Sequence, residues 1–239
     1  MKNTSRYFKV IYEDNHLIAV DKAAGILVQG DDTGDTPLSE LVKEYIAKKY
    51  NKPGAVFCGV IHRLDRPVSG AIVLARTSKG LARMNALFKD REIRKIYWAL
   101  TKDKPETESG TLVHWLKKNT NKNFVNVYGK DTSGAQKAEL DFKILGRTGG
   151  FYLWQIELKT GRPHQIRAQL AKIGCPIKGD VKYGFGKNNP DGSIHLHSKA
   201  LIFEHPVKKE VMHIEAPLPN ESTWNLFHHF AKVKDELDR

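Results

Sequence analysis

The sequence predicts an α+β fold in which a mixed, mostly antiparallel sheet is flanked by a few helices. Two observations predict it. Short apolar or alternating segments fill most of the chain, and a helical spacing of apolar residues occurs in only a few stretches among them. No internal repeat, low-complexity tract or Pro- and Ser-rich linker divides the chain, so we expect one continuous domain over residues 1–239.

Two strands and a helix are expected at the start of the chain. Residues 7–12 and 17–21 are typical of two strands joined by a polar turn. A helix is expected at about 37–49, where apolar residues recur on one face. Thr36 can cap this helix, and the fixed φ of Pro37 suits its first turn.

The next segment is expected to place a polar loop between two buried strands. Residues 55–61 and 70–76 are apolar enough for short strands that are covered on both faces. The loop HRLDRPVSG lies between them. Ser78 can cap a second helix that runs through about residue 89, with its apolar residues facing the core.

Strands dominate the second half of the chain. We expect them at 94–101, 111–116, 124–128, 137–145 and 151–159. The Gly-rich sequence RTGG between the last two indicates a hairpin. A helix is expected at about 163–173, where Gly174 ends it, and a final helix is expected near Ser222.

Composition restricts the class of protein and of partner. The 239 residues carry a formal net charge of +12, which favours nucleic acid or an acidic membrane surface as a partner. No apolar run reaches the roughly 18 residues that span a bilayer, and the N-terminus lacks a signal-peptide pattern. Two cysteines, Cys58 and Cys175, are too few for a disulfide framework or the usual zinc cluster. We therefore expect a soluble, cytoplasmic protein.

The loop from His62 to Gly70 is the densest cluster of chemically active groups in the chain. Asp65 lies between Arg63 and Arg66. A carboxylate beside cations stays ionised, which suits a nucleophile or a group that stabilises charge. The same residues also fit an ion pair that merely holds a strand crossing, and composition alone favours that structural interpretation.

A second cluster runs from Thr160 to Arg167. Its glycine and proline indicate a turn from strand to helix, and the first helical turn then presents His164, Gln165 and Arg167. A helix N-terminus with added arginines, here including Arg162, is a natural anion site. The alternative is an amphipathic helix whose arginines are solvated.

A third stretch, residues 79–104, holds eight basic and three acidic residues around Tyr97 and Trp98. Basic residues interleaved with aromatic residues suit a nucleic acid strand, through phosphate contacts and base stacking. Successive strand residues point to opposite faces, so at least one of the two aromatic residues can equally belong to the core. No metal-ligand spacing and no phosphate- or dinucleotide-binding glycine motif is present, so we expect neither a metal nor a cofactor.

Taken in order, these segments resemble the RluA-like family of RNA pseudouridine synthases. The matching segments are VIYEDNHLIAVDKAAG (10–25), HRLDRPVSG (62–70), RKIYWAL (94–100), TGRPHQIRAQL (160–170), KGDVKYG (178–184) and HLHSKALIFEHP (195–206). They cover nearly the whole chain, and the combination of HRLD-x-x-x-SG with GR-x-HQIR is highly specific. The resemblance implies the pseudouridine synthase fold, with a central catalytic cleft.

The resemblance also implies roles for individual residues. Asp65 matches the essential aspartate of the family, and Tyr97 matches the tyrosine that lies against the target base and can assist proton transfer. Arg167 matches the arginine that pairs with the aspartate, and Arg63 matches a residue thought to fill the gap left by a flipped nucleotide. The full set expected to contact substrate is His62, Arg63, Arg66, Arg162, His164 and Gln165.

The match has two modest departures. Ala23 stands where the family usually has Pro, and Val68 where it usually has Thr. Val68 has no hydroxyl, so any hydrogen bond from a hydroxyl at this part of the loop must come from Ser69 instead. Because the catalytic pattern begins near residue 8, we also expect no separate N-terminal RNA-binding domain.

The hypothesis from the sequence is therefore an RNA pseudouridine synthase that isomerises uridines in structured RNA, either tRNA or rRNA. We expect it to act as a monomer without an obligate protein partner. Two alternatives remain from other classes: an RNA-binding module that kept the fold without catalysis, and a metal-dependent phosphodiesterase using His62 and Asp65. Which RNA and which uridine are modified does not follow from these motifs.

Overall fold

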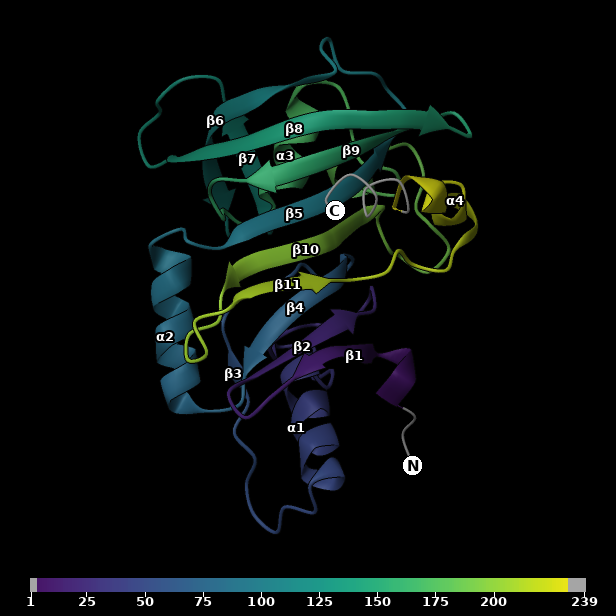
Figure 1. The fold of residues 1–239 in the computed structure, drawn as a ribbon. Helices are drawn as coiled ribbons and strands as arrows, with labels where there is room; N and C mark the ends of the chain where they lie inside the picture. The colour runs from purple at the N-terminus through teal and green to yellow at the C-terminus, as the bar shows by residue number, and fades with distance from the viewer. Residues whose placement is uncertain (1–3, 232–239) are drawn as a thin grey trace. The chain divides into compact units, whose positions relative to one another are not determined.

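The computed structural model describes residues 4–231, which divide into two compact units. The described residues of unit 1 are 4–94 and 198–217, and those of unit 2 are 95–197 and 218–231. Both units combine strands with helices, as labelled in Figure 1. The expected single continuous domain stays a prediction.

Unit 1 is built on strands in the order β1-β2-β4-β10, with β3 paired to β4 and β11 paired to β10. The pairs β1–β2, β2–β4, β3–β4 and β10–β11 are antiparallel. The strands are β1 (Phe8–Glu13), β2 (Leu17–Lys22), β3 (Gly59–Val60), β4 (Ser69–Ala75), β10 (Leu196–Glu204, in this unit from Ser198 on) and β11 (Val211–Glu215). The helices are the 3-10 turn η1 (Thr4–Arg6), α1 (Leu38–Lys49) and α2 (Ser78–Lys89).

The core of unit 1 forms where α2 covers the sheet. All seven residues of β4 are buried, as expected for a central strand that is covered on both faces. Met84 of α2 belongs to one apolar cluster with Leu17 of β2, Val73 of β4 and Phe203 of β10. Phe88 packs against the same cluster, so the predicted apolar face of this helix is confirmed.

Three local predictions in unit 1 are wrong. The N-cap of α1 is Pro37, without a side-chain hydrogen bond, so Thr36 does not cap this helix. The second helix is capped by Thr77 instead of Ser78, because the Thr77 hydroxyl accepts a hydrogen bond from the Gly80 N–H at 3.0 Å. The expected strand at 55–61 reduces to Gly59–Val60, since only these two residues find ladder partners on β4.

Unit 2 is an antiparallel sheet in the order β5-β9-β8-β6-β7. Its strands are β5 (Arg94–Thr101, in this unit from Lys95 on), β6 (Ser109–Asn119), β7 (Phe124–Tyr128), β8 (Gln136–Thr148) and β9 (Phe151–Leu158). The helices are α3 (Gln165–Lys172), the 3-10 turn η2 (Val181–Tyr183) and α4 (Ser222–Asn225). α3 packs on β6 and β7 through a small apolar cluster that includes Leu116, Ala168 and Tyr183.

The α+β class with a mostly antiparallel sheet is confirmed. The hairpin turn between β8 and β9 is also confirmed, since Gly149 and Gly150 both have positive φ, as its tight turn requires. The helix at 163–173 begins two residues later than expected, at Gln165, and Gly174 follows its end with φ +77°. The sequence did not predict β10 and β11. Within residues 4–231, no helix is both long and apolar enough to cross a bilayer.

Gly70 is the position in unit 1 where a side chain should do most damage. Its φ is +113°, and a Cβ would lie 2.3 Å from the carbonyl oxygen of Ser198 on β10. We expect Gly70→Ala to lower the free energy of unfolding by about 2–6 kcal/mol, because backbone strain and overpacking each cost about 1–3 kcal/mol.

Gly34→Ala is the matched control for this substitution. Gly34 also has a positive φ, +75°, but nothing lies within 4 Å of its added Cβ. This variant should lose only the strain, about 1–2 kcal/mol. Urea unfolding of the two variants measures both values, and equal losses would contradict the close contact at Gly70.

Candidate active site

The loop that carries Asp65 is a tight turn leading into β4 in unit 1. The Val68 N–H donates to the Asp65 carbonyl at 3.0 Å, which closes the turn. Leu64 beside it is buried, whereas the Asp65 side chain is half-buried. Arg66 joins the turn to the segment after β2: its carbonyl accepts from the Gly25 N–H at 2.7 Å and its Nε donates to the Gly25 carbonyl at 3.0 Å.

A fully buried ammonium group lies under this turn. Lys22, at the end of β2, donates from Nζ to the carbonyls of Ala23 and Ile26, both at 2.9 Å, and to that of Arg66 at 3.4 Å. Burial lowers the pKa of Lys22 to about 7, although the nearby negative charge of Asp65 opposes that shift. The Asp65 turn is therefore built over a cation that the backbone solvates.

The other predicted residues of this loop have different environments. Arg66 is exposed and forms an ion pair with Asp35 at 2.6 Å, and Arg63 is exposed. His62 accepts a hydrogen bond from the Val73 N–H at Nε2, 3.1 Å away, and its ring stacks on Phe88 at 4.8 Å. His62 therefore helps to fix the base of the loop.

The second predicted cluster lies at the start of α3 in unit 2. His164, the N-cap of this helix, adopts the left-handed conformation with φ 50° and ψ 21°. Its Nδ1 lies 2.8 Å from the hydroxyl of Tyr183 in η2. A left-handed histidine costs of order 1–3 kcal/mol, so the surrounding contacts must hold it in place.

Arg167, one turn further along α3, is buried and pairs with an acid from its own unit. Its Nε and Nη2 donate to Asp180 at 2.7 and 2.9 Å, a bidentate pair in which both partners are buried. The guanidinium also lies 5.1 Å from the centre of the Tyr183 ring. Neither Asp180 nor Tyr183 was predicted as a site residue, although both lie in the segment KGDVKYG.

Gln165 and Arg162 make hydrogen bonds inside unit 2. The Gln165 side chain accepts from the Thr160 hydroxyl at 2.8 Å and from the Arg162 N–H at 3.0 Å, and it donates to the Glu139 carbonyl at 3.1 Å. Arg162 donates from Nε to the Lys137 carbonyl at 3.1 Å. These bonds fix the turn that leads into α3, and the substrate contacts expected of both residues stay a prediction.

Tyr97 lies on β5, opposite Ile156 of β9. Tyr97 and Trp98 are both buried, as is Lys95. The basic stretch at 79–104 is thus not one continuous exposed strand, because its residues belong to α2 in unit 1 and to β5 in unit 2.

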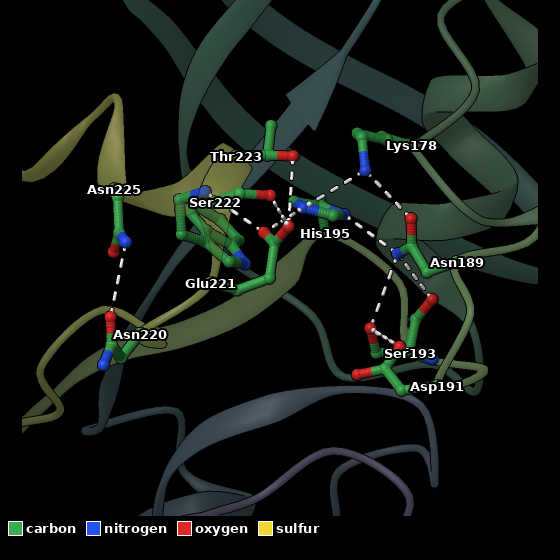
Figure 2. A network of polar contacts seen from close by, with 11 residues as sticks. Lys178, Asn189, Asp191, Ser193, His195, Asn220, Glu221, Ser222, Thr223 and Asn225 are labelled. Atoms are coloured by element: carbon green, nitrogen blue, oxygen red, sulfur yellow. Dashed lines mark hydrogen bonds and ion pairs between the residues drawn. The ribbon is translucent and has the colours of Figure 1, made fainter.

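A further polar network in unit 2 was not foreseen (Figure 2). Lys178 donates to Asn189 at 2.9 Å, Asn189 lies 3.0 Å from Nδ1 of the buried His195, and Nε2 of His195 lies 2.9 Å from Glu221. Burial acts to raise the pKa of Glu221, but hydrogen bonds, with the Thr223 N–H first among them, outweigh it and hold this pKa at about 2. The network connects the loop before β10 to α4. Its residues are far apart in the sequence, and no single motif contains them.

No group of three or more His, Cys, Asp or Glu residues within positions 4–231 could hold a metal ion. His62 and Asp65 therefore do not belong to such a group within these positions. The groups that the two units do present are a carboxylate in unit 1, and a tyrosine and a fixed arginine in unit 2.

Comparison with known proteins decides the family. A model of the RNA pseudouridylate synthase family matches residues 16–172, which include the Asp65 loop, Tyr97 and the start of α3. The chain belongs to this family. This confirms both the predicted family and the predicted class of enzyme, an RNA pseudouridine synthase.

Three relatives illustrate the range of the family. An uncharacterized RNA pseudouridine synthase of Synechocystis is 28% identical over 215 residues, which cover 88% of this chain and 65% of that protein. A ribosomal large subunit pseudouridine synthase C of Rickettsia bellii is 30% identical, with 92% and 70% covered. A tRNA pseudouridine synthase C of Vibrio parahaemolyticus is 30% identical, with 90% and 92% covered. The chain thus spans about two thirds of the first two relatives and nearly all of the third.

The fold of this pseudouridine synthase is also similar to a solved structure. Human RNA pseudouridylate synthase domain containing 4 matches with a TM-score of 0.75 and 22% identity, over 96% of this chain and 92% of that one. At this identity the match is evidence for the fold alone. It confirms the pseudouridine synthase fold that the resemblance implied.

The buried Lys22 should give the synthase a distinctive dependence of stability on pH. Its pKa is about 7 in the folded chain and 10.5 ordinarily. Below pH 7 both the folded and the unfolded chain hold the proton, and the folded chain bears the full cost of the buried charge. Between about pH 7 and 10.5 the folded chain releases the proton first, so the contribution of Lys22 to stability rises with pH.

Lys22→Met tests this dependence. We expect the free energy of unfolding of the wild type, relative to that of the variant, to rise between pH 7 and 10 in urea titrations. Lys52→Met, at an exposed lysine of the same unit, should give a constant difference over this range. Parallel pH curves for wild type and Lys22→Met would contradict the lowered pKa.

Proposed function

We propose that this protein isomerises specific uridines to pseudouridine in structured RNA, with Asp65 as the essential carboxylate. The observation that carries the proposal is the family match across the Asp65 loop, Tyr97 and Arg167. The reaction breaks the N1–C1′ bond of uridine and joins C1′ to C5 of the same uracil; N1 gains a proton and C5 loses one. It is redox-neutral and consumes no co-reactant, so the proposal includes neither cofactor nor metal.

In this proposal Asp65 engages the sugar or the base of the target. The half-buried carboxylate sits on a turn whose backbone is closed internally and tied to Gly25. A rigid turn keeps the carboxylate oriented without further loss of entropy when RNA binds. The buried Lys22 beneath the turn donates to the Arg66 carbonyl and so helps to hold the turn in place.

Unit 2 is proposed to supply the groups that handle the uracil. Tyr97 would lie against the base and assist proton transfer, and Arg167 would pair with the carboxylate. The bidentate bond to Asp180 supports this assignment, because it fixes the plane of the Arg167 guanidinium in advance. His164 is proposed as an additional contact to the RNA.

A target uridine in stacked or paired RNA must first be extruded, at a cost of a few kcal/mol. We propose that the exposed Arg63 fills the vacated space, as the resemblance implies. Since named relatives act on tRNA or on ribosomal RNA, either class is a candidate substrate. We further propose that the protein acts as a monomer in the cytoplasm.

Asp65→Asn should reduce pseudouridine formation by at least about a thousandfold, because it removes the essential carboxylate while keeping the size of the side chain. Binding of the RNA should stay within about twofold of wild type. The measurement is chemical mapping of pseudouridine in total RNA from cells that lack the gene, after incubation with each protein. Asp32→Asn, at an exposed carboxylate of unit 1, is the control and should keep full activity. Retained activity in Asp65→Asn would falsify the assignment.

The affinity for RNA should fall steeply with salt, because exposed lysines bind phosphates by displacing counterions. We expect a loss of at least about tenfold between 50 and 200 mM salt. Replacing Lys79 and Lys102, both exposed, with Ala should reduce the salt slope by about one per lost phosphate contact. Lys209→Ala should leave the slope unchanged, because Glu204 already pairs with Lys209 at 2.9 Å. An affinity that stays flat over this range would exclude phosphate contacts as its main source.

A further inference from the structure

Tyr183 has a buried hydroxyl that connects two functional segments of unit 2. The hydroxyl accepts a hydrogen bond from the Val125 N–H of β7 at 3.0 Å, and it lies 2.8 Å from Nδ1 of His164. A tyrosine hydroxyl has one proton to donate. Val125 donates to the oxygen, and the hydroxyl can donate its own proton to Nδ1 of a His164 ring that carries its proton on Nε2.

One tautomer of His164 fits this direction of the hydrogen bond. When Nδ1 accepts, Nε2 must carry the proton in the neutral ring. The contact also holds the ring of a residue whose left-handed backbone is costly for histidine. One hydrogen bond thus holds the orientation of the His164 ring, and the direction of this bond depends on the tautomer.

The ring of Tyr183 contacts the second functional side chain. The Arg167 guanidinium lies 5.1 Å from its centre, while Asp180, three residues before Tyr183, holds the same guanidinium in the bidentate pair. The guanidinium is therefore confined by an ion pair at its edge and by an aromatic ring. Both constraints come from one short segment, residues 180–183.

Tyr183 is itself anchored to the basic hairpin of β6 and β7. Phe124 of β7 stacks on its ring at 4.7 Å with an interplanar angle of 21°. Lys182, next to Tyr183, donates to the Asn123 carbonyl at 3.0 Å. The hairpin carries the exposed Lys117 and Lys118 near its tip, so its charge suits an RNA backbone.

We propose that Tyr183 is a positioning residue for the modification of RNA, which acts by fixing His164 as its Nε2–H tautomer and by confining Arg167. His164 then presents Nε2–H as a donor to an oxygen atom of the RNA, and Arg167 enters the reaction with its plane already set. Phe124 and Val125 of the β6–β7 hairpin hold Tyr183 in position. The positive charge of this hairpin suits phosphate binding. This inference rests on the proposed function.

Tyr183→Phe tests the inference, because it removes the hydroxyl and keeps the ring. Nitrogen-15 NMR of labelled histidine reports the tautomer directly, with the His164 signals assigned from a His164→Asn variant. We expect the Nε2–H tautomer in the wild type and a mixture of tautomers in Tyr183→Phe. We also expect kcat/KM for pseudouridine formation to fall by about tenfold to a hundredfold, as for other small misplacements of reacting groups. Tyr128→Phe, at a tyrosine of β7, should change neither value.

Two further comparisons separate positioning from stability. All variants are assayed at a temperature where circular dichroism shows them folded. If Tyr183 acts through His164, the double variant with His164→Asn should lose less activity than the product of the two single losses. An unchanged tautomer, or an unchanged kcat/KM in the folded Tyr183→Phe protein, would overturn the inference while leaving the proposed function intact. Absence of pseudouridine formation by the wild type would overturn the proposed function, and the tautomer measurement would still test what Tyr183 does to His164.

Discussion

Each unit buries a basic side chain in a segment that is predicted to be functional, and it must satisfy the hydrogen bonds of that side chain within its own fold. In unit 1 the ammonium of Lys22 is solvated by backbone carbonyls, one of which belongs to Arg66 in the Asp65 turn. In unit 2 the guanidinium of Arg167 is paired with the buried Asp180. An unsatisfied buried charge costs several kcal/mol, so neither segment can move without breaking these contacts. The geometry of the functional loops is thus a consequence of how the buried charge is satisfied.

These contacts also explain why the clustered arginines are not interchangeable. Arg66 is bound to Asp35 and to the Gly25 carbonyl, and Arg162 is bound to the Lys137 carbonyl. Arg167 is buried, whereas Arg63 is exposed. Groups that are held in position by their own unit need little reorganisation when charge develops nearby, which is the usual source of electrostatic catalysis. An exposed arginine has the freedom that insertion into a nucleic acid stack requires.

The sequence predicted most elements because their local signals agree with their tertiary environment. The strand β5 and the hairpin of β8 and β9 are examples, since apolar patterning and turn glycines indicate the same structure. Predictions failed where strand formation depends on pairing with residues that are distant in the sequence. Residues 55–58 were expected in a strand and are not in one, whereas β10 was not expected and pairs with β4. The same holds for the site. Asp65 and Arg167 lie in specific motifs, but the contacts of Lys22 and Tyr183 on which their proposed roles rest cross the fold, and no sequence spacing encodes them.

The net charge of +12 therefore divides into two physically different parts. Exposed lysines such as those of the β6–β7 hairpin are surrounded by water, and salt screens their charge within a Debye length of about 8–10 Å. The buried basic side chains Lys22 and Arg167 are screened far less when charged, because protein surrounds them. Attraction of RNA and orientation of the reacting groups should consequently respond to different variables. Ionic strength acts on the first part, whereas pH and the packing of segments such as 180–183 act on the second.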